Sequence, residues 1–197
     1  MLLRRLGGPA VHAAGLGCAF ALAACAGLAP ERPTSSVIFP PPRASFEAAG
    51  RLSVRHGTDA VTANYRWRHD GVRDELDLVS PLGQTIARLS GGPDGVELRT
   101  SDGRVVTAAD WAALTARPLD WPMPVDGLAF WIQGAPRADV AFASEPGADG
   151  TLRVLRQEGW TIVYQAFASD AAGVVRPTRM TLSYPDVELR LIVDSWQ

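Results

Sequence analysis

The sequence contains no lysine, so all 19 of its basic side chains are arginines. These arginines are scattered along the chain and form no basic stripe, which argues against a nucleic-acid-binding protein. With 21 acidic residues the net charge is −2. The chain has 197 residues, of which 47% are hydrophobic and 20% charged. These values indicate a globular protein with room for one domain and a real core, not a disordered chain.

Cysteine and long hydrophobic runs are also scarce. Cys18 and Cys25 are the two cysteines, and no pair of cysteines or histidines has the spacing of a zinc site. The longest apolar run, residues 13–27, is too short to cross a bilayer, which takes about 20 residues. Because Arg4 and Arg5 precede this run and small residues end it, the layout is typical of a secretory signal peptide.

The inventory of catalytic groups is equally thin. No Gly-x-Ser-x-Gly motif is present, and the glycine-rich stretch 91–95 lacks the lysine and the following helix of a phosphate-binding loop. We therefore predict that the protein is not an enzyme and needs no metal or dissociable cofactor. The alternative is a hydrolase in which the fold brings His56 or His69 next to a serine and a carboxylate.

The end of the signal peptide is specific. Leu22-Ala23-Ala24-Cys25 matches the bacterial lipobox, so we predict a lipoprotein signal peptide over residues 1–24 and a lipidated Cys25, carrying an S-diacylglyceryl and an N-acyl group. The alternative is a soluble secreted protein with an incidental cysteine. Cleavage leaves a chain with a single cysteine, which allows no intramolecular disulfide. The mature chain has 17 arginines against 21 acidic residues, so its acyl chains must hold it to a bilayer.

Residues 25–45 read as a proline-rich linker, with five prolines among serine and threonine. Val37, Ile38 and Phe39 interrupt it, and we expect them to pack back onto the folded body. Residues 46–197 are predicted to form one domain.

This domain shows β-strand alternation in two blocks, with Asp-Gly turn signals between the segments. The predicted strands are 50–56, 62–69, 74–80, 84–90, 95–100, 103–107, 151–157, 160–167, 176–184 and 187–196. Between the blocks we predict helices over 107–116, with Thr107 as N-cap, and over 124–134. The fold class is therefore mainly β (α+β). It is predicted as a single curved antiparallel sheet forming an incomplete barrel, with a helical lid over an apolar cavity.

Apolar residues on the predicted inner faces are candidates for the cavity or its lid. They are Trp67, Leu76, Leu78, Trp111, Leu128, Trp131, Ile132, Val163 and Leu189. The alternative is that the tryptophans are ordinary core residues. Sequence does not separate the two, because both roles need an apolar face.

One turn carries an unusual residue. Ser80-Pro81-Leu82-Gly83-Gln84 lies between two predicted strands, and its proline and glycine direct a large apolar side chain, Leu82, toward solvent. A single exposed leucine is ordinary on a protein surface.

Taken in order, the motifs of the mature chain resemble the LolB family of outer-membrane lipoprotein receptors. They are a lipobox and a Pro-rich linker, followed by "GRLSVRH", "ANYRWRH", "DELDLVSPLGQTIARL", "GVELRTSDGR", "LDWPMPVDGLAFWIQG", "GWTIVYQAF" and "VELRLIVDSW". The most specific are "SPLGQT" and "PVDGLAFWIQG". Relatives can carry a helix before residue 46, whereas the prolines here predict none.

The resemblance implies a receptor that accepts lipoproteins from the soluble periplasmic carrier LolA and inserts them into the inner leaflet of the outer membrane. Its cavity would hold cargo acyl chains. It implies that Leu82, presented by Pro81 and Gly83, serves membrane insertion. Ala26 is not the aspartate that retains lipoproteins in the inner membrane, so we expect sorting to the outer membrane, with the lipid-anchored protein facing the periplasm. We also expect a monomer. The alternative is a lipid-binding or structural outer-membrane lipoprotein with the same fold and no carrier partner.

Overall fold

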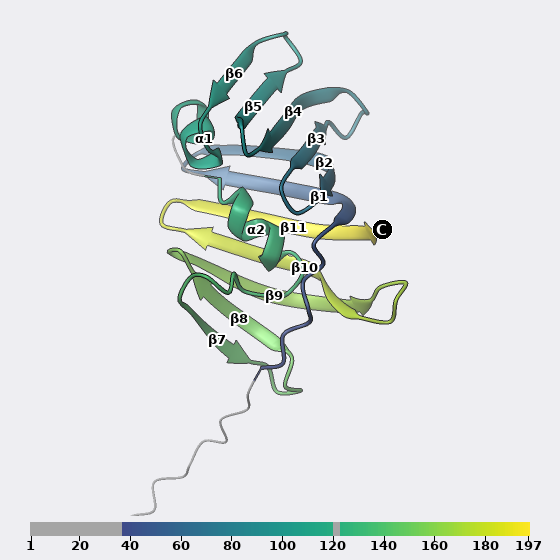
Figure 1. The fold of residues 1–197 in the computed structure, drawn as a ribbon. Coiled ribbons are helices and arrows are strands. Elements are labelled where there is room, and N and C mark those ends of the chain that lie inside the picture. The colour runs from purple at the N-terminus through teal and green to yellow at the C-terminus, as the bar shows by residue number, and fades with distance from the viewer. Residues whose placement is uncertain (1–36, 120–122) are drawn as a thin grey trace, which may run out of the picture. The chain divides into compact units, whose positions relative to one another are not determined.

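The computed structural model describes residues 37–119 and 123–197, and for residues 116–119 it describes the backbone alone. The predicted signal peptide, Cys25 and the first part of the predicted linker lie outside the described residues. One antiparallel sheet of eleven strands dominates the described part, in the order β6-β5-β4-β3-β2-β1-β11-β10-β9-β8-β7. The strands β6 and β7 do not pair with each other, so the sheet stays open and the predicted fold class is confirmed (Figure 1).

The first half of the sheet is a meander that starts in its middle. Its strands are β1 Phe46–His56, β2 Asp59–His69, β3 Asp74–Val79, β4 Thr85–Gly92, β5 Gly95–Thr100 and β6 Val105–Ala108. The second half returns to the middle from the other edge. Its strands are β7 Phe142–Pro146, β8 Leu152–Gln157, β9 Trp160–Ser169, β10 Val175–Tyr184 and β11 Val187–Trp196. The strand β7 is an addition to the predicted set.

The two faces of the sheet differ in chemistry. Alternate residues such as Leu52, Trp67 and Leu189 are buried on one face, here called the inner face, where the core lies. The opposite, outer face carries cross-strand ion pairs, among them Arg51 with Asp194 and Arg88 with Asp77. Because side chains alternate along a strand, this division follows directly from the sequence pattern.

Two short helices separate the halves. The helix α1, Trp111–Leu119, packs beside β5 and β6, and α2, Val125–Trp131, lies across β10 and β11 (Figure 1). The prediction that Thr107 caps the first helix is wrong, because Thr107 is paired in β6. Asp110 takes that role, since its Oδ1 accepts the amide hydrogen of Ala113 at 2.7 Å. No helix among the described residues is long and apolar enough to cross a membrane.

The end of the linker, residues 37–45, is an extended segment without helix that lies against the body. Val37 and Phe39 pack on the core, whereas Ile38 is 89% exposed. The Phe39 ring meets that of Phe142 edge-to-face, with centroids 5.5 Å apart. Arg43 bonds through its backbone amide to Gln133 and through its guanidinium to Asp170. The linker therefore joins the fold before Phe46, the predicted start of the domain.

Candidate functional site: an apolar cavity under the meander

An apolar cavity of about 420 Å³ lies on the inner face of the first half of the sheet. Strands β1 to β5 supply most of its wall, and Thr115 of α1 and Met123 close it from the helical side. The other lining residues are Leu52, Val54, His56, Asp59, Val61, Ala63, Leu78, Ile86, Ala87, Leu89, Leu98 and Thr100. Its size is that of pockets that enclose a small apolar ligand.

Burial varies along the cavity. Leu52 and Ala63 are buried, whereas Val61, two residues nearer the β1–β2 turn, is 54% exposed. The cavity therefore opens toward the end of the sheet that carries the β1–β2, β3–β4 and β5–β6 turns. In an antiparallel meander these three turns share one end.

Of the residues predicted for the cavity or its lid, one lines the cavity and the others lie in α2 and the turn after it, in the core or on the outer face. Leu78 lines the cavity. Leu128, Trp131 and Ile132 belong to α2 and the turn that follows it, and all three are buried. The remaining buried candidates pack in the core; they are Trp67, Leu76, Trp111 and Leu189.

Val163 points the other way. Its strand neighbours Ile162 and Tyr164 are buried on the inner face, and Val163 pairs with Val154 and Thr181 on the outer face. It lies away from both the cavity and the helices. The small residues Ala63 and Ala87, which leave space in the cavity, carried no signal in the sequence, because alanine is common on any inner face.

The helix α2 is fixed to the second half of the sheet by buried polar contacts. The Tyr164 hydroxyl donates to the carbonyl of Trp131 at 2.9 Å, and the Trp131 Nε1–H donates to Gln157 Oε1 at 2.8 Å. Burial raises the pKa of the Tyr164 phenol, which keeps its hydroxyl protonated for this bond. The end of α2 is therefore a rigid part of the structure, on the half of the sheet opposite the cavity.

The turn between β3 and β4 projects Leu82 into solvent, where it is 90% exposed. The Ser80 amide donates to the Gln84 carbonyl at 2.7 Å, and the Gly83 amide donates to the Ser80 carbonyl at 2.9 Å. Gly83 has a φ of +86°, a conformation that favours glycine.

The same turn is continuous with the cavity. Leu78 and Ile86, on the two strands that enter and leave it, both line the cavity wall. No residue between them is charged. An exposed leucine thus stands at the open end of an apolar cavity on an uncharged hairpin.

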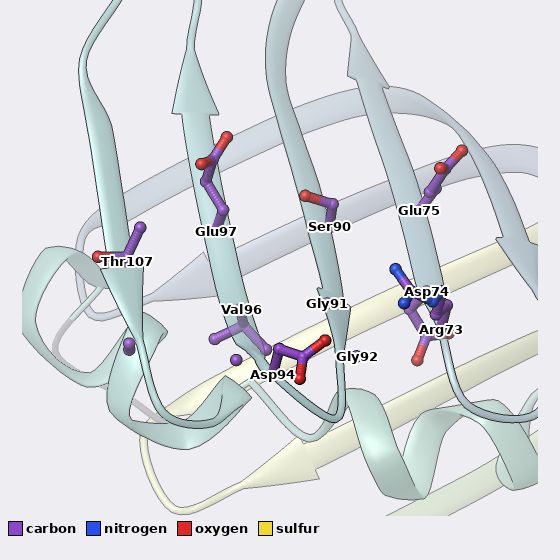
Figure 2. Close-up of a pocket in the computed structure, with 12 residues that line it drawn as sticks. Arg73, Asp74, Glu75, Ser90, Gly91, Gly92, Asp94, Val96, Glu97 and Thr107 are labelled. Carbon is purple, nitrogen blue, oxygen red and sulfur yellow. The ribbon is translucent and has the colours of Figure 1, made fainter.

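A second hollow, of about 300 Å³, lies at the other end of the same strands and has a different character. Figure 2 shows that its labelled side chains are mostly polar or charged, among them Asp74, Glu75 and Glu97. The glycine-rich stretch 91–95 borders it as the hairpin between β4 and β5. This polar hollow offers no surface for an acyl chain.

The two histidines of the domain have different surroundings. His69 lies at 2.8 Å from Asp74, whose carboxylate also accepts the Trp67 Nε1–H at 2.7 Å. His56 lies at the rim of the apolar cavity. Among residues 37–119 and 123–197, no group of three or more His, Cys, Asp or Glu side chains is arranged to hold a metal ion.

An open antiparallel sheet, with an apolar cavity on its inner face and an exposed apolar turn at the mouth, defines the class of half-barrels with an apolar cavity. A similar fold occurs in a DUF1329 family protein from Desulfovibrio piger, with a TM-score of 0.51 and 9% sequence identity, over 78% of this chain and 85% of that one. The family model described as outer membrane lipoprotein LolB matches residues 44–196, and the chain belongs to the LolB family.

Similar proteins support the same assignment. An outer-membrane lipoprotein LolB from Thiobacillus denitrificans is 38% identical over 91% of this chain and 93% of its own length. One from Chromobacterium violaceum is 36% identical over 92% of this chain and 96% of its own.

Proposed function

We propose that the protein is an outer-membrane lipoprotein receptor, which takes lipoproteins from a soluble periplasmic carrier of the LolA type and inserts them into the inner leaflet of the outer membrane. Membership of the LolB family supports this function and location. The observation that carries the mechanism is the apolar cavity, with Leu82 at its open end. Cys25 would carry the lipid anchor.

The cavity explains why a receptor is needed. Exposing one 16-carbon acyl chain to water costs on the order of 10 kcal/mol, at ~0.8 kcal/mol per methylene. A direct passage from the carrier's apolar site into this cavity avoids most of that cost. The reaction is a transfer between binding sites, so it needs no catalytic group.

Delivery requires contact with the bilayer, and Leu82 provides it. Burying one leucine gives ~1.5–3 kcal/mol, which is too little to anchor a protein. It is enough to orient the cavity mouth toward the lipid while acyl chains on Cys25 hold the protein in place.

A transfer assay tests this function. Purified carrier loaded with a lipoprotein is mixed with the mature protein, and the two are separated and probed for cargo. We expect the cargo to move to the receptor and then into added liposomes. If cargo stays on the carrier while the protein still extracts free lipid, the protein is a lipid-binding lipoprotein without a carrier partner.

A further inference from the structure

The apolar cavity has one polar end. His56 is the last residue of β1 and Asp59 is the first residue of β2, and the two residues pair directly across the hairpin. Both line the cavity. They share the inner face with Leu52 and Ala63, which are buried deeper in it.

Their side chains have unused hydrogen-bonding capacity. Thr115, which also lines the cavity, donates its hydroxyl hydrogen to the Trp111 carbonyl at 2.9 Å and accepts the Met123 amide hydrogen at 2.7 Å. The Thr100 hydroxyl bonds to Asp102. Within the described part of the chain, neither His56 nor Asp59 has a side-chain hydrogen bond or ion pair, although both border the cavity.

We propose that His56 and Asp59 form a polar subsite at the rim of the cavity, which binds the ester and amide or amine groups at the head of an acylated ligand. An imidazole offers an N–H donor, which suits an ester carbonyl, and a carboxylate accepts from an amide N–H or an ammonium. The inference rests on the proposed function, because the cavity must hold acyl chains for the head to reach this rim.

The subsite fixes the direction in which a ligand lies. His56 lies four positions along β1 from Leu52, about 13 Å at 3.3 Å per residue. An acyl chain would run from the hairpin toward Leu52, Leu89 and Met123, all of which line the cavity. Its polar head would stay at the end of the sheet that carries Leu82, and would therefore meet the membrane surface first.

Two ligands share this head chemistry: the N-acyl, S-diacylglyceryl cysteine of a lipoprotein, and an aminophospholipid of the bilayer. Binding is measured with the full chain carrying Cys25→Ala, which has no acyl group of its own. The probes are a pyrene-labelled acylglycerol ester and a pyrene-labelled alkane of equal length. The test variant is His56→Phe with Asp59→Leu, and Thr58→Val in the same hairpin is the matched control.

We expect the double variant to weaken ester binding about tenfold and to leave alkane binding unchanged, while the control binds both probes like the parent. Weaker binding of the ester probe alone distinguishes the loss of a polar subsite from damage to the whole cavity. Equal weakening of both probes, or no change in either, overturns the subsite, provided that thermal unfolding shows the variant folded.

Competition identifies the source of the head group. A triacylated lipopeptide and phosphatidylethanolamine are each used to displace the ester probe. The ligand whose competition weakens in the double variant is the one that the subsite binds. The proposed function is tested separately by cargo transfer to the parent protein. Transfer with no ester preference overturns the subsite alone, and an ester preference without transfer overturns the receptor function alone.

Discussion

Arg176 and Asp170 form a buried ion pair, with 2.8 Å between Nε and Oδ2 and side chains that are 2% and 1% exposed. The Asp170 carboxylate also accepts a bond from Arg43 in the linker, at 2.7 Å. The Arg176 guanidinium lies over the Trp196 ring of β11 and reaches Gln133 after α2. This pair therefore joins the linker, the end of α2 and the sheet at one point.

Removing the arginine from this pair should destabilise the fold. Arg176→Gln leaves a buried carboxylate with fewer donors, and we expect a loss of about 3 kcal/mol. Thermal unfolding should show a melting temperature roughly 10 °C lower. Arg51→Gln, which breaks an exposed pair with Asp194 on the outer face, is the control and should change little. Equal effects of the two variants would contradict the structural role of Arg176.

The same pair predicts an acid dependence. Burial by itself would raise the pKa of the Asp170 carboxyl, but bonds from Arg176 and the Val174 and Ala172 amides, with the charge of Arg43, lower it below its ordinary value. Because the pKa is lower in the folded state, the stabilisation is present above about pH 4, the unfolded value, and is lost as the pH falls through the folded pKa. Asp170→Asn should lack this contribution. Urea titrations across pH should show the two proteins converging in acid.

Leu82 should act in delivery and not in folding. Since the side chain is 90% exposed, Leu82→Glu should leave the melting temperature and cargo acceptance unchanged and reduce transfer from the receptor into liposomes. Val72→Glu, at another exposed apolar residue in the β2–β3 turn, is the matched control. Normal delivery by the Leu82 variant would mean that the β3–β4 turn has only a structural role.

Filling the cavity should block acceptance of cargo. Ala87 lines the cavity and is buried, so Ala87→Phe places a ring in the space that an acyl chain would occupy. The cavity has room for the ring, and we expect a stability change of about 1 kcal/mol or less with cargo transfer lost. Ala60→Phe on the outer face of β2 is the control. Transfer assays and thermal unfolding are run on both variants, and full transfer by Ala87→Phe would place the cargo elsewhere.

The backbone conformation of Glu158 offers a way to stabilise the protein. Glu158 has a φ of +53° in the β8–β9 turn, followed by Gly159 at +79°. Asparagine tolerates this conformation better than glutamate, and Asn-Gly is favoured in such hairpins. Glu158→Asn should gain about 0.5–1 kcal/mol, even though it loses the exposed bond to Arg137. Glu158→Gln keeps the backbone cost and should show no gain in thermal unfolding.

The strands and the exposed turn were predictable because their signals are local. Alternation of apolar and polar residues located ten of the strands, and the Pro-Leu-Gly sequence identified a turn with an exposed tip. The strand β7 carried no such signal. Its residues Phe142–Pro146 are mostly exposed at the sheet edge and show no buried alternation. The helix start was misplaced because Thr107 and Asp110 are both good caps, and pairing of β6 with β5 decided between them.

The site was only partly predictable, because alternation within a strand does not show what packs opposite each residue. Leu76 and Leu78 alternate identically in one strand, yet Leu76 is buried in the core and Leu78 lines the cavity. What separates them is the packing opposite each, where distant residues such as Ala63, Ala87 and Met123 leave space or close it. The polar rim of His56 and Asp59 becomes visible only when the register of the hairpin is known.

The middle of the sheet joins the first strand of the domain to the last. Gly50 of β1 pairs with Val193 of β11 beside a bulge, where a Cβ atom would lie 2.0 Å from the Ile192 carbonyl oxygen. Non-local pairing of this kind makes folding slow, since a long loop must close before the contacts form. Until β11 has been synthesised and exported, β1 remains an open edge. An unpaired strand edge is a template for pairing with another chain, so the unfinished sheet is prone to aggregation until the ten residues of β11 take their place beside β1.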